Sequence, residues 1–193
     1  VKEITAPEGY LLDEEEHDVV CDYEGDLVAE VSRSTTSAEQ VMKQPFQMIK
    51  VSDNGEDTEA PLLEQAGFTA YLKSSLSVKE DGSYDFDSAT PVVIGANGET
   101  QLFTDAKGHL VTIPIPYGTY VVIETVTPHN METIKPFEVH ITENNPNQPQ
   151  IWRVFIDREF TAKLRVIKMD ADTGMTVLIP NTEFKIFNMD TNQ

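Results

Sequence analysis

Three ionisable side chains of this 193-residue chain lie within apolar stretches that alternate like β-strands. Lys50 alternates with Phe46 and Met48, and Glu124 alternates with Tyr120, so both side chains are expected to point toward a core. Burial favours the neutral, nucleophilic form of an amine, and it favours the protonated form of a carboxylic acid, which can then donate and shuttle protons. If both side chains are buried, the lysine is a candidate nucleophile and the glutamate a candidate general acid.

The third residue, Asp157, ends a strand-like run in which it alternates with Phe155 and Arg153, so its face is less clearly a core face. A single charge at a strand end usually extends toward solvent, and this interpretation stays open for each of the three residues. Their occurrence together, near the start and the end of one repeat, favours a shared buried site.

The composition argues against several classes of function. With 33 acidic and 14 basic residues the net charge is −19, which disfavours a nucleic-acid partner because phosphate binding needs Lys and Arg. There is no apolar run long enough to span a membrane, so no direct membrane insertion is expected. The single cysteine, Cys21, excludes an intrachain disulfide, and its apolar neighbours predict a buried structural thiol.

Sequence motifs for metal binding or for turnover of an external substrate are not found. The aspartates of the segment 81–87 lack the ligand order of a calcium loop and indicate a hairpin turn instead. No nucleophile elbow, phosphate loop or dinucleotide fingerprint occurs, so we do not expect an enzyme. The histidines show no ligand-like spacing, so no metal and no other cofactor is expected at His17, His109, His129 or His140.

Short alternating runs separated by turn residues predict an all-β sandwich. The clearest runs begin at Phe68, His109, Thr119, Phe137 and Ile151. The only helix candidates are a turn or two long, at 38–42 and 62–66.

The chain also repeats part of itself. The strand that ends at Lys50 and its following Asp-Asn-Gly match the strand that ends at Lys168 and its following Asp-Thr-Gly, while Glu3 and its following Pro match Glu124 and Pro128. We therefore expect the end of one repeat, a linker, a complete domain and the start of another repeat, at residues 1–33, 34–44, 45–158 and 161–193.

Four motifs carry a resemblance to a known family. They are the apolar strand leading to Lys50, the Thr-Asp-x-x-Gly hairpin ending at Gly108, the Gly-x-Tyr-x-x-x-Glu strand ending at Glu124, and Phe-Ile-Asp ending at Asp157. In these motifs the chain resembles the Cna B-type family of SpaA-like pilins and adhesins of Gram-positive surface proteins, over 45–158 and both partial repeats. The resemblance implies a Greek-key, prealbumin-like (Cna B, Ig-like) β-sandwich in tandem repeats.

The resemblance also implies an autocatalytic isopeptide bond. Lys50 would be the nucleophile, Asp157 the electrophile that releases water, and Glu124 the acid and base. Glu3 and Lys168 would be the counterparts in the partial repeats, of which the first has no Asn or Asp in the acceptor position of its last strand. A loop on the order of 100 residues closed by such a bond would be stabilised by roughly 4–5 kcal/mol.

The expected function is that of a structural stalk or shaft module in an extracellular, cell-wall-anchored adhesin or pilus-like protein, with the other repeats as partners. The alternative is an adhesive module that binds a glycan, a mucin or a matrix protein through the insertion 73–99, although this insertion could equally cover a sheet edge. A non-catalytic domain of a carbohydrate-active enzyme fits the sandwich but not the Lys–Glu–Asp set. Pairing of 1–33 with 161–193 also stays open.

Overall fold

A computed structural model describes residues 1–53, 61–151, 153–159, 164–177, 183–187 and 189. The chain divides into two compact units, Val1–Phe160 and Thr161–Gln193. The described residues contain no helix that is long and apolar enough to cross a membrane.

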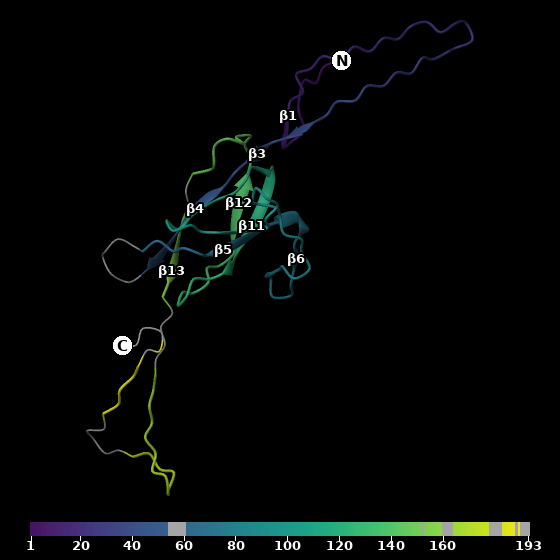
Figure 1. The fold of residues 1–193 in the computed structure, drawn as a ribbon. Helices are drawn as coiled ribbons and strands as arrows, with labels where there is room; N and C mark the ends of the chain where they lie inside the picture. Colours follow the sequence, from purple (N-terminus) through teal and green to yellow (C-terminus); the bar gives the residue numbers. More distant parts are fainter. Residues whose placement is uncertain (54–60, 152, 160–163, 178–182, 188, 190–193) are drawn as a thin grey trace. The chain divides into compact units, whose positions relative to one another are not determined.

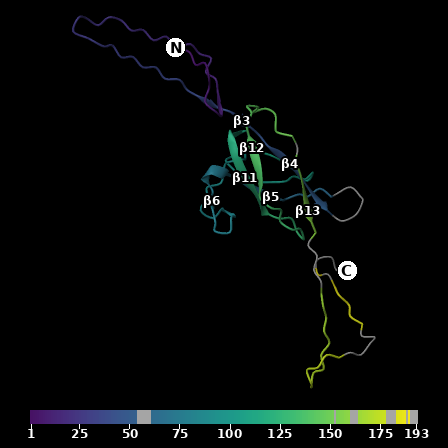
Figure 2. The same ribbon diagram turned by 180° about the vertical axis from the view of Figure 1, so that it is seen from behind.

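Two sheets form the main body of the first unit (Figure 1). One has the strand order β12-β11-β5-β8, and the other has the order β13-β4-β9. Seen from behind in Figure 2, the labelled strands of both sheets again gather in the same region. The strands of the first sheet are β5 (Gly67–Leu72), β8 (Gln101–Phe103), β11 (Gly118–Val126) and β12 (Phe137–Ile141), and those of the second are β4 (Gln47–Asp53), β9 (His109–Val111) and β13 (Arg153–Arg158).

Residues from both sheets form one apolar core, so the two sheets make a sandwich. The buried core residues are Phe46, Met48, Ala66, Phe68, Ala70, Ile94, Leu110, Ile115, Tyr120, Val122, Val139 and Ile141. They alternate with less buried neighbours along β12 and at the start of β4, as expected for strands that have one face in the core, whereas on β11 Val121 is buried as well as Tyr120 and Val122. All the runs predicted as strands are therefore found as β5, β9, β11, β12 and β13.

The pairing of β13 with β4 is the only parallel pairing among the named strands of the described residues. Its register places Phe155 opposite Lys50 and Asp157 opposite Ser52. On its other side β4 pairs with β9 in antiparallel register. The strand that carries Lys50 therefore lies directly beside the strand that carries Asp157.

Short strand pairs complete the first unit. They are β1 (Tyr10–Leu11) with β2 (Gln40–Val41), β3 (Lys43–Gln44) with β10 (Ile115–Pro116), and β6 (Ser77–Val78) with β7 (Tyr84–Asp85). The one helical turn in the described part of the chain is the 3-10 turn η1 (Lys73–Ser75). The β6–β7 pair confirms the hairpin predicted at 81–87.

Both helix candidates were wrong. Residues 40–41 form β2, because they pair with β1 instead of forming helical hydrogen bonds within 38–42. In the second candidate, Leu63 N–H donates to Lys50 O at 3.0 Å and Ala66 N–H donates to Thr104 Oγ1 at 3.0 Å. A helix over 62–66 would need the Ala66 N–H for a bond to Leu62 O, and Gln65 has a φ of +64°, outside the right-handed helical range.

The expectation of a buried thiol was also wrong, since Cys21 is exposed. Residues 12–39, all of which the structure describes, contain no named strand, so the apolar residues around Cys21 have no sheet to pack against. In the second unit the described residues form an isolated bridge, Met169 with Thr176, and a turn in which Asp170 Oδ1 accepts the Thr173 N–H at 2.8 Å.

Candidate functional site

Lys50 projects from β4 into the core of the sandwich. It alternates with Met48 and Ser52, and all three are buried, with no measurable exposure of Lys50. Its Nζ lies 5.6 Å from the ring centroid of Phe68 on β5. The lysine therefore reaches across the core to the facing sheet instead of extending to solvent.

The turn between β8 and β9 fixes the backbone of Lys50. Lys50 N–H donates to Gly108 O at 2.7 Å, and Gly108 has a φ of +66°. A Cβ on Gly108 would lie 2.3 Å from Lys50 O, so only glycine fits against β4 here. Asp105 Oδ1 accepts the N–H groups of Lys107 and His109, at 2.8 and 2.9 Å, and closes the turn. The Thr-Asp-x-x-Gly motif thus has a local role, which is to place the lysine strand.

Glu124 enters the same space from β11 in the facing sheet. It follows Tyr120 and Val122 on the core face of the strand, and a register shift in the pairing with β5 comes directly after it. Its Oε1 lies 3.3 Å from Lys50 Nζ, and its Oε2 accepts the Ile134 N–H at 2.9 Å. Burial raises the pKa of this carboxyl group, against the opposing influence of the Ile134 N–H and of Lys50.

Asp157 reaches the cluster from β13, which settles the face that the sequence left open. Its alternation partner Phe155 stacks on Phe137 of β12, with ring centroids 4.1 Å apart. Arg153 Nη1 donates to Glu138 O on the same strand at 2.5 Å. The inward face of β13 is therefore held against β12, and Asp157 is fully buried.

Lys50 Nζ forms ion pairs with both Asp157 and Glu124, and the three side chains have no exposed surface. Burial raises the pKa of Asp157, and the contact with Lys50 opposes this rise. Within the described part of the chain, no hydrogen bond of normal geometry reaches Lys50 Nζ, Glu124 Oε1 or either carboxyl oxygen of Asp157. Buried charges without hydrogen bonds are costly, so the arrangement favours the uncharged forms of the amine and the carboxyl groups.

The predicted counterparts in the partial repeats lie in different surroundings. Glu3 Oε2 accepts the Asp13 N–H at 2.6 Å, and Glu3 is partly exposed. Lys168 is exposed in the second unit, where its backbone oxygen accepts the Val177 N–H at 2.9 Å. Neither residue lies in a buried cluster like that of Lys50.

Part of the insertion 73–99 packs against its own sandwich, while residues 77–83 are exposed. Phe86 lies 5.1 Å from Tyr71 between ring centroids, Val92 N–H donates to Ala70 O at 2.8 Å, and Ile94 is fully buried. These contacts favour the interpretation of the insertion as a cover for the edge of β5.

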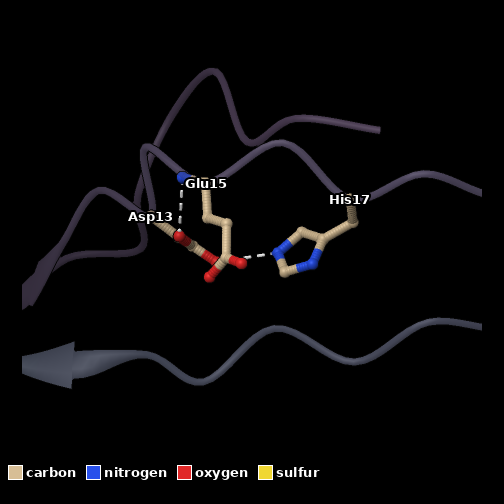
Figure 3. A group of neighbouring side chains, drawn as sticks. All are labelled: Asp13, Glu15 and His17. Atoms are coloured by element: carbon tan, nitrogen blue, oxygen red, sulfur yellow. Dashed lines mark hydrogen bonds and ion pairs between the residues drawn. The ribbon is translucent and has the colours of Figure 1, made fainter.

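A second cluster, Asp13, Glu15 and His17, was not anticipated from the sequence (Figure 3). Each side chain offers one atom that could bind a metal ion, and these three atoms lie within 4.8 Å of one another. The Asp13 carboxylate is already used, because it accepts hydrogen bonds from Ser37 Oγ, the Glu15 N–H and His17. These contacts, the Ser37 hydroxyl first, lower the pKa of Asp13 to about 2. Spacing of i, i+2 and i+4 was the only sequence signal, and it lies within a generally acidic run.

Comparison with known proteins agrees with the architecture. The family model for the SpaA prealbumin-like fold domain matches residues 45–152, which is more than half of the chain. No curated protein matches the chain.

Three similar solved structures come from Gram-positive bacteria. The TIE protein of Bacillus anthracis is 23% identical at a TM-score of 0.49, with 82% of this chain and 24% of that chain covered. The shaft pilin SpaA of Lactobacillus rhamnosus GG is 18% identical at a TM-score of 0.47, with 70% of this chain and 59% of that chain covered. The minor pilin GBS52 of Streptococcus agalactiae is 20% identical at a TM-score of 0.45, with 66% of this chain and 50% of that chain covered.

The chain thus spans less than two thirds of each of these structures. The family match covers the strands that carry Lys50 and Glu124, and it ends just before β13. By this match the chain belongs to the SpaA family of prealbumin-like fold domains.

Proposed function

We propose that the chain is a structural stalk or shaft module of a Gram-positive surface adhesin or pilus-like protein, locked by an amide bond between Lys50 and Asp157. Residues 45–158 are the complete domain, and 1–33 and 161–193 belong to neighbouring repeats. The observation that carries the proposal is the meeting of Lys50, Glu124 and Asp157, from three strands, in one buried cluster. The protein is extracellular and cell-wall-anchored, and its partners are other repeats of the same surface protein.

The reaction is a condensation. The neutral Nζ of Lys50 attacks Cγ of Asp157 while Glu124, protonated on Oε1, donates a hydrogen bond to a carboxyl oxygen of Asp157. One C–N bond forms and one C–O bond breaks. Glu124 accepts a proton from the nitrogen and delivers a proton to the departing oxygen, so one water molecule leaves and Glu124 is restored.

Burial supports this direction of reaction. A raised pKa favours the protonated form of Glu124 that the step needs, and it also favours the uncharged acid form of Asp157, whose carbonyl is the better electrophile. Condensation replaces an ammonium and a carboxylate, which are costly to bury, by an uncharged amide.

The bond would join β4 to β13, which flank the complete domain. It would close a loop on the order of 100 residues, and the chain-entropy model gives a stabilisation of roughly 4–5 kcal/mol for such a loop. A chain with one cysteine cannot obtain this stabilisation from an intrachain disulfide.

Intact-protein mass spectrometry of the wild type and of Glu124→Ala tests the proposal. We expect the wild type to be lighter than its sequence by one water molecule and the variant to have the full mass. A wild type of full mass would refute the bond.

A further inference from the structure

The connection 127–136, between β11 and β12, holds the catalytic carboxyl group from one side. Ile134 N–H donates to Glu124 Oε2 at 2.9 Å, and Oε1 of the same group faces Lys50 Nζ at 3.3 Å. An oxygen that accepts an N–H in this way is poorly placed to carry a proton toward the same donor. The proton of the acid form therefore lies on Oε1, on the side of the reacting groups.

The same connection contacts the acceptor strand. Glu132 N–H donates to Arg158 O at 2.9 Å, and Met131 forms an antiparallel bridge with Glu159. These contacts begin one residue after Asp157. Because β4 pairs with β13 on the other side, Asp157 lies on a segment that is held along both edges.

We propose that the connection 127–136 is a positioning segment for amide formation, in which the Ile134 N–H holds Oε2 of Glu124 and directs the acid's proton toward Lys50 and Asp157. The inference rests on the proposed amide bond. According to this inference, the orientation of the Glu124 acid is set by the Ile134 N–H, a backbone group outside the cluster.

The Ile134 N–H also opposes the burial that raises the pKa of Glu124. The charged and titratable groups that face Glu124 are Lys50 from β4 and Asp157 from β13. Removal of the N–H raises the pKa of Glu124 further, because the bond stabilises the carboxylate more than the acid. The acid form then persists to higher pH, although it is no longer held in place.

A single-atom change tests this role. The amide of residue 134 is replaced by an ester by translating the full chain with the α-hydroxy analogue of isoleucine, which removes the N–H and keeps the side chain. The matched control is the ester at Gln148, whose N–H donates to Asn145 O at 3.2 Å in the connection between β12 and β13, outside the segment 127–136. Unreacted chain held in urea is diluted into buffers from mildly acidic to mildly alkaline pH. Folding is followed by circular dichroism, and the loss of water is followed by intact mass after acid quenching.

We expect the ester at Ile134 to lower the maximal rate of water loss by about tenfold, a part of the roughly 100- to 10,000-fold that a positioned acid contributes. We also expect the alkaline limb of its pH profile to move to higher pH. The control ester should move neither quantity. A lower rate with an unmoved alkaline limb would indicate a merely structural effect and would overturn the proposal, as would a profile equal to that of the control.

Failure of the underlying bond gives a different result, since the wild type itself would then keep its full mass at every pH. If the ester protein does not fold, a second measurement uses the variant Lys50→Met, which cannot form the bond. In this variant the chemical shift of the Ile134 amide proton, measured by NMR, should follow the titration of Glu124. A shift that is independent of pH overturns the proposal.

Discussion

Replacement of Glu124 by glutamine isolates the contribution of the proposed bond. The glutamine side chain keeps the shape of the original one, and its carbonyl oxygen can still accept the Ile134 N–H that now reaches Oε2 at 2.9 Å. The variant has no acid to donate a proton, so Lys50 and Asp157 should stay an unreacted ion pair. The main difference from the wild type is then the missing cross-link.

The loss of stability follows from the loop that the bond closes. For a loop on the order of 100 residues the chain-entropy model gives about 4.7 kcal/mol. With a urea dependence of about 2 kcal/mol per M, the unfolding midpoint falls by about 2 M. For a domain of this size, at about 4 °C per kcal/mol, the melting temperature falls by about 20 °C.

Urea and thermal unfolding, each with an intact mass on the same sample, measure the effect of Glu124→Gln. The matched control is Glu138→Gln on β12, which removes partly exposed ion pairs with Lys73 and His140 and should change the free energy of unfolding by less than about 1 kcal/mol. The reasoning would be refuted by a Glu124→Gln protein that has lost water. It would also be refuted by a midpoint within about 0.5 M of a cross-linked wild type.

Three further predictions concern the same site. Asp157→Asn should release ammonia and give a product identical in mass to the reacted wild type, so an unreacted mass would contradict the assigned acceptor. In Lys50→Met the buried carboxyls of Glu124 and Asp157 keep raised pKa values, so the free energy of unfolding should fall as pH rises from about 4 through these values; urea titrations that show constant or rising stability would contradict this. Gly108→Ala places a Cβ 2.3 Å from Lys50 O at a φ of +66°, so it should lower the free energy of unfolding by about 2 kcal/mol or more and slow the loss of water. Its control is Gly82→Ala, at a φ of +83° with open space around it, which should lower the free energy of unfolding by about 1 kcal/mol and leave the rate unchanged. Equal effects of both changes on unfolding and on mass kinetics would count against the role of Gly108.

Local patterns predicted two members of the cluster because their faces follow from period-two alternation. Lys50 follows Met48, and Glu124 follows Tyr120, on faces that the structure buries. A strand with one apolar face has little choice of which side to bury, so these positions can be read from neighbouring residues.

The placement of Asp157 could not be read in this way. Its face is set by contacts between β13 and β12, the stack of Phe155 on Phe137 and the bond from Arg153 to the backbone of Glu138. A guanidinium alternating with an aspartate looks polar in the sequence, although both point inward. Such contacts between segments distant in sequence cannot be derived from local periodicity.

The errors have a related cause. The residues near Cys21 form a short apolar run like that of a strand, but in this structure they have no neighbouring strand to pair with. Residues 38–42 have good helix composition, yet a partner strand takes their backbone hydrogen bonds. In both cases the absence or presence of a partner strand, and not local propensity, decided the structure.

The parallel register of β13 beside β4 also determines how far the chain can lengthen. Lys50 lies on the first long strand of the sandwich and Asp157 on its last, with Phe155 directly opposite the lysine. Once these side chains are joined, the residues between them are excluded from the path between the chain ends. On the order of 100 residues at about 3.5 Å each represent about 350 Å of contour length that remains folded away even when every hydrogen bond of the sandwich is broken. Each module of this kind would then behave as a link of nearly constant length.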